Sequence, residues 1–147
     1  AVFIKFIEKD KNLEKIHSTI KNINPEIKIF NSLVQIKDID KFDLTKKYVT
    51  FSGIGNAESF KSLLKKNSFD VIKEIVFPDH HNYKMSEIEN ILNKTKKLKA
   101  NLITTEKDFV KLPDNYKHLI NFLDIELKII DENRLIEFIK SKIYETN

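Results

Sequence analysis

The sequence predicts an α/β fold in three layers, with a mostly parallel, Rossmann-like sheet between helices. Two observations indicate this class. Short apolar runs alternate with amphipathic segments along most of the 147 residues, and parallel strands need such helical crossovers. Three of the apolar runs end in polar clusters, at the sheet edge where α/β proteins bind ligands. The length fits one domain, so we expect residues 1–147 to form a single domain.

The first third of the chain predicts a strand, a helix and a second strand. Residues 2–7 form a short apolar run that charge interrupts at once, which is typical of a strand and not of a signal peptide. Asp10 can cap a helix whose apolar positions recur at helical spacing, until Asn24-Pro25 ends it. Residues 27–34 then predict the second strand.

The middle of the chain continues the alternation. The polar residues 37–47 predict a loop, and residues 48–51 predict a short buried strand. That strand runs into a glycine-containing turn and a helix with apolar positions from Phe60 to Leu64. Residues 70–77 predict the next strand.

The last third predicts further helices, each opened by a capping residue. Two capping boxes have a hydroxyl followed three residues later by an acid: Ser86 with Glu89, and Thr105 with Asp108. A strand over residues 100–104 separates them. Residues 119–130 hold one or two strand pieces, and Asp131 caps the last helix.

Composition excludes several kinds of site. Without cysteine there is no disulfide, thiolate metal site or cysteine nucleophile. The net charge of +4 is carried by lysine, and Arg134 is the only arginine. Nucleic-acid readers favour arginine and interleaved aromatics, so we predict no nucleic-acid partner. We interpret the lysine excess as a compositional bias, with attraction to an anionic membrane or substrate as the alternative.

The apolar runs and the start of the chain also give information about the class of protein. No run of about 18 apolar residues could span a bilayer. The chain opens on a predicted strand at Ala1, without an initiating Met. We interpret this start as a sign that the sequence is a piece of a longer protein, with a processed or trimmed start as the alternative.

The first polar cluster, Ser52-Gly53-Ile54-Gly55-Asn56, contains both glycines of the chain. Glycine permits positive φ and close backbone approach, so this turn can present backbone N–H groups to a phosphate or sugar oxygen. A third glycine is missing for a dinucleotide fingerprint, and no Gly-Lys-Ser/Thr follows for a Walker A loop. The alternative is a tight turn in which Asn56 caps the next helix.

The second cluster is Asp79-His80-His81, which follows Pro78 at a strand end. Histidine exchanges protons near neutral pH, and an adjacent carboxylate can orient it. Neighbouring side chains in an extended segment point opposite ways, so only one histidine should face a given pocket. The other histidines offer no ligand spacing, so we predict no metal site. A hydrated loop with Asp79 bonded to nearby backbone is the alternative.

Five consecutive polar residues form the third cluster: Thr104, Thr105, Glu106, Lys107 and Asp108. The capping box accounts for the second and the last of them. Lys107 and Lys111 lie near the predicted helix start, where a lysine can meet phosphate. A solvated helix N-terminus with local ion pairs is the alternative.

Taken together and in this order, the three clusters resemble the C-terminal half of the tetraacyldisaccharide 4'-kinase family. The matching segments are residues 49–56, 77–83 and 102–112. The resemblance is firm over residues 48–112 and looser at both ends. Ala57 departs from the family, which often has proline after Gly-Asn.

The resemblance implies a lipid kinase that transfers the γ-phosphate of ATP, with Mg²⁺, to the 4'-hydroxyl of tetraacyldisaccharide 1-phosphate in lipid A biosynthesis. It implies a peripheral enzyme at the cytoplasmic face of the bacterial inner membrane. Such an enzyme has two lobes with the active site between them. Its P-loop, its acidic Mg²⁺ motif and a catalytic aspartate lie in the N-terminal lobe. This chain contains none of these, so we expect it to be the C-terminal lobe and to be inactive alone.

The resemblance also implies roles for residues of this chain. In the family, the histidine of the Asp-His pair works with the aspartate base of the other lobe. This role would fall on His80, with Asp79 as the residue that orients it. The other cluster residues are expected to line or shape the cleft for substrate or nucleotide: Ser52, Gly53, Gly55, Asn56, His81, Thr104, Thr105, Glu106, Lys107 and Asp108.

Two other functions are compatible with the sequence. Metal-dependent phosphoesterases are named for an Asp-His-His motif, but they need further acids at earlier strand ends. Here the upstream candidate is Asp38-Ile39-Asp40, within a polar loop, and no glycine follows Gly55 to form a glycine-rich binding domain. The other alternative is a non-catalytic α/β module that binds or regulates a partner.

Overall fold

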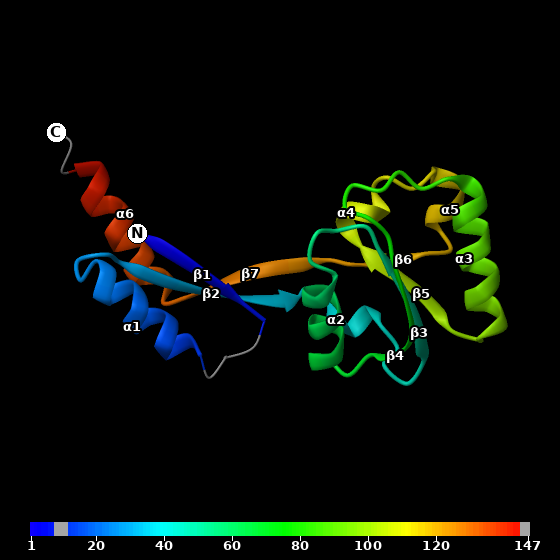
Figure 1. Cartoon of the computed structure of the whole chain (residues 1–147), viewed down its shortest axis with the longest axis horizontal. Coiled ribbons are helices and arrows are strands. Elements are labelled where there is room, and N and C mark those ends of the chain that lie inside the picture. Colours follow the sequence, from blue (N-terminus) through cyan, green and yellow to red (C-terminus); the bar gives the residue numbers. More distant parts are fainter. Residues whose placement is uncertain (8–11, 145–147) are drawn as a thin grey trace. The chain divides into compact units, whose positions relative to one another are not determined.

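The computed structural model describes residues 1–7 and 12–144, in which strands and helices alternate (Figure 1). The elements are β1 (Val2–Phe6), α1 (Leu13–Ile23), β2 (Ile29–Ile36), the 3₁₀ helix η1 (Ile39–Lys41), β3 (Lys47–Ser52), α2 (Ala57–Lys66), β4 (Asp70–Val76), α3 (Met85–Lys97), β5 (Asn101–Thr105), α4 (Glu106–Phe109), α5 (Asp114–Lys117), β6 (Asn121–Leu123), β7 (Ile125–Ile130) and α6 (Glu132–Tyr144). The predicted α/β class with mostly parallel strands is confirmed. The predicted cap Asp10 lies outside the described residues.

The strands form two sheets, where the sequence had suggested one. One sheet has the strand order β1-β2-β7 and the other β4-β3-β5-β6. The chain accordingly divides into two compact units, Ala1–Gln35 with Glu126–Asn147, and Ile36–Ile125. Local periodicity identifies a strand but does not say which distant strand it pairs with, so this division was not apparent from the sequence.

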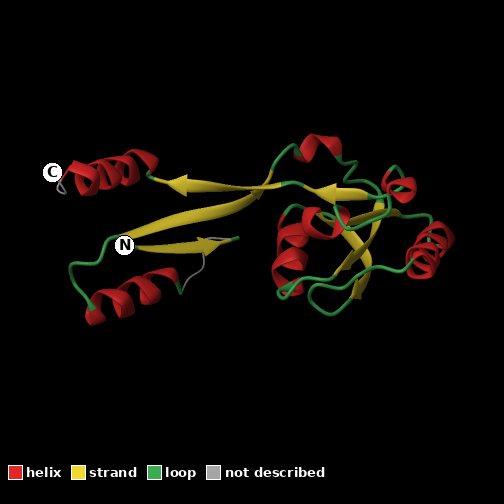
Figure 2. Cartoon of the chain, turned by 90° about the horizontal axis from the view of Figure 1, so that it is seen from above, coloured by secondary structure: helices red, strands yellow, loops and turns green. Residues whose placement is uncertain are grey.

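The first unit has a helix on each face of its sheet. β1 pairs in parallel with β2, and the arrows of β2 and β7 in Figure 2 point in opposite directions. On one face, the Phe30 ring lies 5.4 Å from that of Phe138 in α6. On the other, His17 of α1 is hydrogen-bonded to Asn31 at 2.9 Å. Because successive strand residues point to opposite faces, these contacts place α1 and α6 on opposite sides.

The second unit is a parallel sheet in which β3 pairs with both β4 and β5, and β5 with β6. Figures 1 and 2 show α2 on one side of this sheet and α3 on the other. The core cluster consists of Val49, Phe51, Tyr83, Ile88, Ile91, Leu102, Leu112 and Ile120. Full burial of one such aliphatic side chain contributes about 1.5–3 kcal/mol, so this core holds the strand ends in place.

The strand order creates a switch point between β3 and β5. From β3 the chain crosses to β4 on one side, whereas β5 and β6 extend the sheet on the other side. The turns that leave the carboxyl ends of β3 and β5 therefore diverge. In open α/β sheets, ligands bind at such a place.

Two of the predicted helix caps are confirmed and one is wrong. The confirmed caps are Asn56, whose Oδ1 accepts the Ser59 N–H at 3.0 Å, and Thr105, whose Oγ1 accepts the Asp108 N–H at 3.2 Å. The predicted Ser86–Glu89 box is not formed, because α3 begins at Met85. There, Glu87 Oε2 accepts the Lys84 N–H at 2.8 Å. Across residues 1–7 and 12–144, no helix combines the length and apolarity needed to cross a bilayer.

Candidate functional site

The three polar clusters meet at the carboxyl edge of the second unit's sheet. The Gly53 N–H donates to Asp108 Oδ2 at 2.9 Å, which joins the first cluster to the third. The Gly53 carbonyl accepts the His80 N–H at 3.1 Å, which joins the first to the second. Lys107 Nζ lies 3.5 Å from Asp79 Oδ1, which joins the second to the third. The clusters therefore form one continuous structure around the switch point.

Three ionisable side chains, those of Asp79, His80 and Lys107, lie together on the accessible part of this edge. His80 Nε2 lies 3.7 Å from Asp79 Oδ2, and the His80 side chain is 74% exposed. Desolvation raises the pKa of Asp79. The hydrogen bond from the backbone N–H of His80 and the positive charges of His80 and Lys107 outweigh this effect, so the pKa is lowered overall. An ionised carboxylate thus lies between an imidazole and an ammonium group, which can exchange a proton and attract a phosphate respectively.

The backbone of His80 is fixed in an uncommon conformation. Its φ of 60° lies in the left-handed region, where non-glycine residues are rare. The His80 N–H points to two acceptors, the Gly53 carbonyl at 3.1 Å and Asp79 Oδ1 at 2.9 Å. These bonds hold the peptide and direct the imidazole away from the core.

His81 has the opposite environment, as neighbouring residues in the loop were expected to have. Its ring stacks on Phe77 with centroids 4.5 Å apart and lies 5.0 Å from the Tyr83 ring. His81 Nε2 is hydrogen-bonded to Glu87 Oε2 at 3.0 Å, and its side chain is 21% exposed. His81 therefore anchors the loop to α3 and the core.

Neither glycine adopts a positive φ, and both lie where the Asp-His-His loop approaches the backbone closely. A Cβ on Gly53 would lie 3.0 Å from the Tyr83 hydroxyl and 3.2 Å from the Pro78 carbonyl. A Cβ on Gly55 would lie 3.1 Å from Asp79 Oδ2. The absence of both side chains lets the Asp-His-His loop lie directly on the turn after β3.

The remaining cluster residues lie beneath or beside the accessible group. Asp108 is fully buried, and so is Thr104, whose hydroxyl donates to the Phe51 carbonyl at 2.7 Å. Ser52 is also buried at the end of β3. Glu106 is exposed in the first turn of α4. The buried members can shape the site but cannot themselves contact a substrate.

Sequence reasoning missed Glu87 and Tyr83. Glu87 bonds both the Lys84 N–H and the His81 ring, so it ties the loop to the start of α3. The Tyr83 hydroxyl is buried and has no hydrogen-bond partner within the described part of the chain. Burial raises the pKa of Tyr83, and the Asp108 carboxylate raises it further. Aromatic residues on both sides of the histidine pair, at Phe77 and Tyr83, were a signal that this loop packs on the core.

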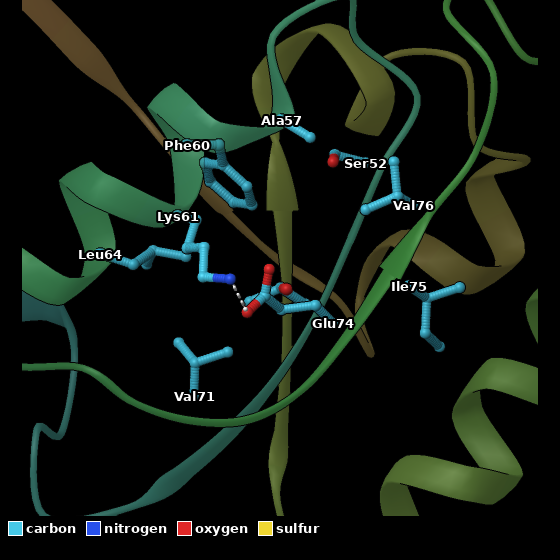
Figure 3. A pocket seen from close by; sticks show the side chains of 10 residues that line it. Ser52, Ala57, Phe60, Lys61, Leu64, Val71, Glu74, Ile75 and Val76 are labelled. Atoms are coloured by element: carbon cyan, nitrogen blue, oxygen red, sulfur yellow. Dashed lines mark ion pairs between the residues drawn. The ribbon is translucent and has the colours of Figure 1, made fainter.

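The second unit has two hollows besides the accessible group. A cavity of about 10 Å³ lies between α2 and β4, beside the Lys61–Glu74 ion pair of 3.2 Å (Figure 3). It has room for about one water molecule. A groove of about 550 Å³ lies near the amino ends of β5 and β6, with Asn101 and Asn121 among its lining. The groove is separate from the switch point, where the ionisable groups gather, whereas Ser52 of the first cluster lines the small cavity.

The arrangement defines the chain as an α/β protein with a polar site at the carboxyl edge of a parallel sheet. Residues 4–144 match the model of the family described as tetraacyldisaccharide-1-P 4'-kinase. The chain belongs to this family. The match favours the kinase interpretation of the sequence over the phosphoesterase and the non-catalytic module.

Similar proteins carry the same description. The chain is 36% identical over 126 residues to a tetraacyldisaccharide 4'-kinase of Pelagibacter ubique (strain HTCC1062), covering 86% of this chain and 40% of the relative. It is 42% identical over 113 residues to that of Rickettsia canadensis (strain McKiel), covering 75% and 34%. The chain thus spans well under half of the length of these relatives.

A solved structure supports the fold. The chain resembles the crystal structure, described as the "apo" form in complex with ATP, of LpxK from Aquifex aeolicus. The TM-score is 0.52 at 19% identity, and the similarity covers 95% of this chain and 50% of that one. At this level of identity the comparison concerns the fold alone.

Proposed function

We propose that this chain is the C-terminal part of a tetraacyldisaccharide 4'-kinase, which phosphorylates the 4'-hydroxyl of tetraacyldisaccharide 1-phosphate in lipid A biosynthesis. Family membership supports the activity. The observation that carries the site is the accessible group at the switch point, where His80 Nε2 lies 3.7 Å from Asp79 Oδ2 and Lys107 Nζ lies 3.5 Å from Asp79 Oδ1. The complete protein would work as a peripheral enzyme at the cytoplasmic face of the inner membrane.

The phosphate donor would be ATP with Mg²⁺, held mainly by an N-terminal lobe. The residues of this chain do not fit these groups by themselves. The sequence has no Gly-Lys-Ser/Thr loop to surround the β- and γ-phosphates. Within residues 1–7 and 12–144, no three or more acidic or histidine side chains gather where they could hold a metal ion. The proposal therefore assigns to this chain only the acceptor side of the reaction.

Phosphoryl transfer to a hydroxyl depends on positioning, charge neutralisation and a base near the acceptor. The His80 imidazole can hold the proton that the 4'-hydroxyl releases, in concert with the family's aspartate base. The ionised Asp79 orients this ring. Lys107 adds positive charge where negative charge gathers on the phosphate oxygens.

Kinetics of the complete protein test this proposal. His80→Ala should lower kcat for phosphoryl transfer to tetraacyldisaccharide 1-phosphate by about 10²-fold or more, the usual contribution of a group that moves protons. His118→Ala is the matched control, because His118 is exposed after α5 and lies outside the three clusters. A near-normal kcat for His80→Ala would contradict the site. A wild-type protein without this kinase activity would contradict the function.

A further inference from the structure

Asp108 is a buried carboxylate directly beneath the accessible group. Its residue is 0% exposed. Oδ2 accepts the Gly53 N–H at 2.9 Å and the Thr105 hydroxyl at 2.8 Å. Oδ1 accepts from Lys111 Nζ at 3.2 Å. Three donors, one of them the positively charged Lys111, therefore compensate the cost of removing this carboxylate from water.

Helix capping alone does not account for this carboxylate. The Thr105 hydroxyl already accepts the Asp108 N–H at 3.2 Å, which caps α4 without any help from the Asp108 side chain. In a capping box, the acid would accept the N–H of the cap residue. Here Oδ2 instead reaches across the switch point to the turn after β3, 55 residues away in the sequence.

The bond to Gly53 leads to His80. The N–H of Gly53 is held by Asp108, and the carbonyl of the same residue accepts the His80 N–H at 3.1 Å. The His80 peptide needs such support because its φ is 60°. Gly53 cannot shift freely, since the Tyr83 hydroxyl and the Pro78 carbonyl surround the position of its missing Cβ.

We propose that Asp108 is a positioning residue of the phosphoryl-transfer site, which acts through the Gly53 peptide to hold His80 in its left-handed conformation. The part of this inference that concerns catalysis rests on the proposed function. Asp108 is buried and does not contact the substrate. Its carboxylate fixes the turns after β3 and β5 to each other, and the Asp-His-His loop is then built on the fixed turn.

The first test is Asp108→Asn in the complete protein. The amide keeps one oxygen, which can still face Gly53 and Thr105, but it loses the charge that strengthens these bonds and pairs with Lys111. We expect kcat to fall by about 10–10²-fold with KM nearly unchanged, because a small misplacement of a catalytic group costs about this much. Asp114→Asn is the matched control, since Asp114 forms an Asp–Lys pair of the same spacing with Lys117 at a 94% exposed side chain.

A double variant separates positioning from a general loss of structure. If Asp108 acts through His80, then His80→Ala/Asp108→Asn should have the kcat of His80→Ala alone. Losses that multiply in the double variant would overturn the inference, as would a normal kcat for Asp108→Asn.

Hydrogen exchange tests the structural link without any assay of activity. In Asp108→Asn, the amides of Gly53 and His80 should exchange about tenfold faster, because a neutral acceptor holds the Gly53 N–H more weakly than a charged one. The Ser59 amide, capped by Asn56, should keep its rate. Unchanged exchange at His80 would overturn the inference even in an active kinase. Faster exchange at both amides would support it even if the kinase function failed.

A milder pair of variants serves if Asp108→Asn does not fold. Thr105→Val removes the hydroxyl that donates to Asp108, whereas Thr105→Ser keeps it. The valine variant should show faster exchange at His80 and a lower kcat, and the serine variant should restore both. Equal behaviour of the two variants would overturn the inference.

Discussion

The edge of the second sheet has an outer group, Asp79, His80 and Lys107, and an inner group, Gly53, His81 and Asp108. The outer side chains are 43–74% exposed, whereas Asp108 is fully buried and His81 is packed on aromatic rings. Members of the two groups are sequence neighbours, at positions 80 and 81 and at positions 107 and 108. The comparison teaches that adjacent residues divide the work: one is open to solvent, where we propose that it meets the substrate, and the next fixes the loop.

Charge in the outer group should affect catalysis more than stability. Asp79→Asn keeps an oxygen for the His80 N–H but loses the charge that faces the imidazole. In the complete protein we expect kcat/KM to fall by about 10²-fold, because His80 loses the charged group that orients it. Steady-state kinetics and thermal unfolding measure the two effects. A large loss of stability with normal kinetics would assign Asp79 to the inner group.

Close approach in the inner group should show as a stability loss. Gly53→Ala places a methyl group against the Tyr83 hydroxyl and the Pro78 carbonyl, and overpacking of this kind costs about 1–3 kcal/mol. Gly55→Ala is the matched control, because its methyl group meets the end of the Asp79 side chain, which can rotate away. In thermal unfolding, the midpoint of Gly53→Ala should lie well below that of Gly55→Ala. Equal midpoints would show that the loop adapts to either methyl group.

The second histidine should behave as a packing residue. His81→Ala removes the stack on Phe77 and the bond to Glu87, each of which contributes about 0.5–1.5 kcal/mol. We expect a lower unfolding midpoint, and a smaller loss of kcat than in His80→Ala. If the two variants lost kcat equally, the division between outer and inner histidines would be contradicted.

The smallest effect concerns pH. The Lys84 N–H and the His81 ring lower the pKa of Glu87 in the folded protein. This contribution to stability is complete above the ordinary glutamate pKa, about 4.3, and is lost as the pH falls through the lowered folded pKa. The difference in unfolding midpoint between wild type and Glu87→Gln should therefore shrink on acidification below about pH 4. Glu58→Gln, in the first turn of α2, is the control for helix-dipole effects. A difference in midpoint that stays constant with pH would contradict the contribution assigned to the Glu87 carboxylate.

The sequence predicted the elements of the fold better than their pairing. Strand and helix periods are local, so apolar runs located β3 and β5 closely. The return of β7 to the side of β2, across about 90 residues, has no local pattern. Periodicity therefore could not predict that the strands form two sheets instead of one.

The candidate site was predictable to the level of the strand ends. Parallel strands bring their carboxyl ends to one edge, so the convergence of the three clusters followed from the fold class. The direction of individual side chains did not follow. Whether the Asp108 side chain caps its own helix or reaches Gly53 depends on atomic geometry. Because α3 begins at Met85, Glu87 and not Glu89 is the acid that bonds to the loop before this helix.

The φ of 60° at His80 has an evolutionary consequence. A non-glycine residue in the left-handed region costs of order 1 kcal/mol or more, and glycine adopts the same conformation without that cost. His80→Gly would relieve this strain while it removes the imidazole. Selection of the complete protein for heat resistance alone would then favour loss of the side chain, so we expect His80→Gly to raise the unfolding midpoint while it removes the imidazole.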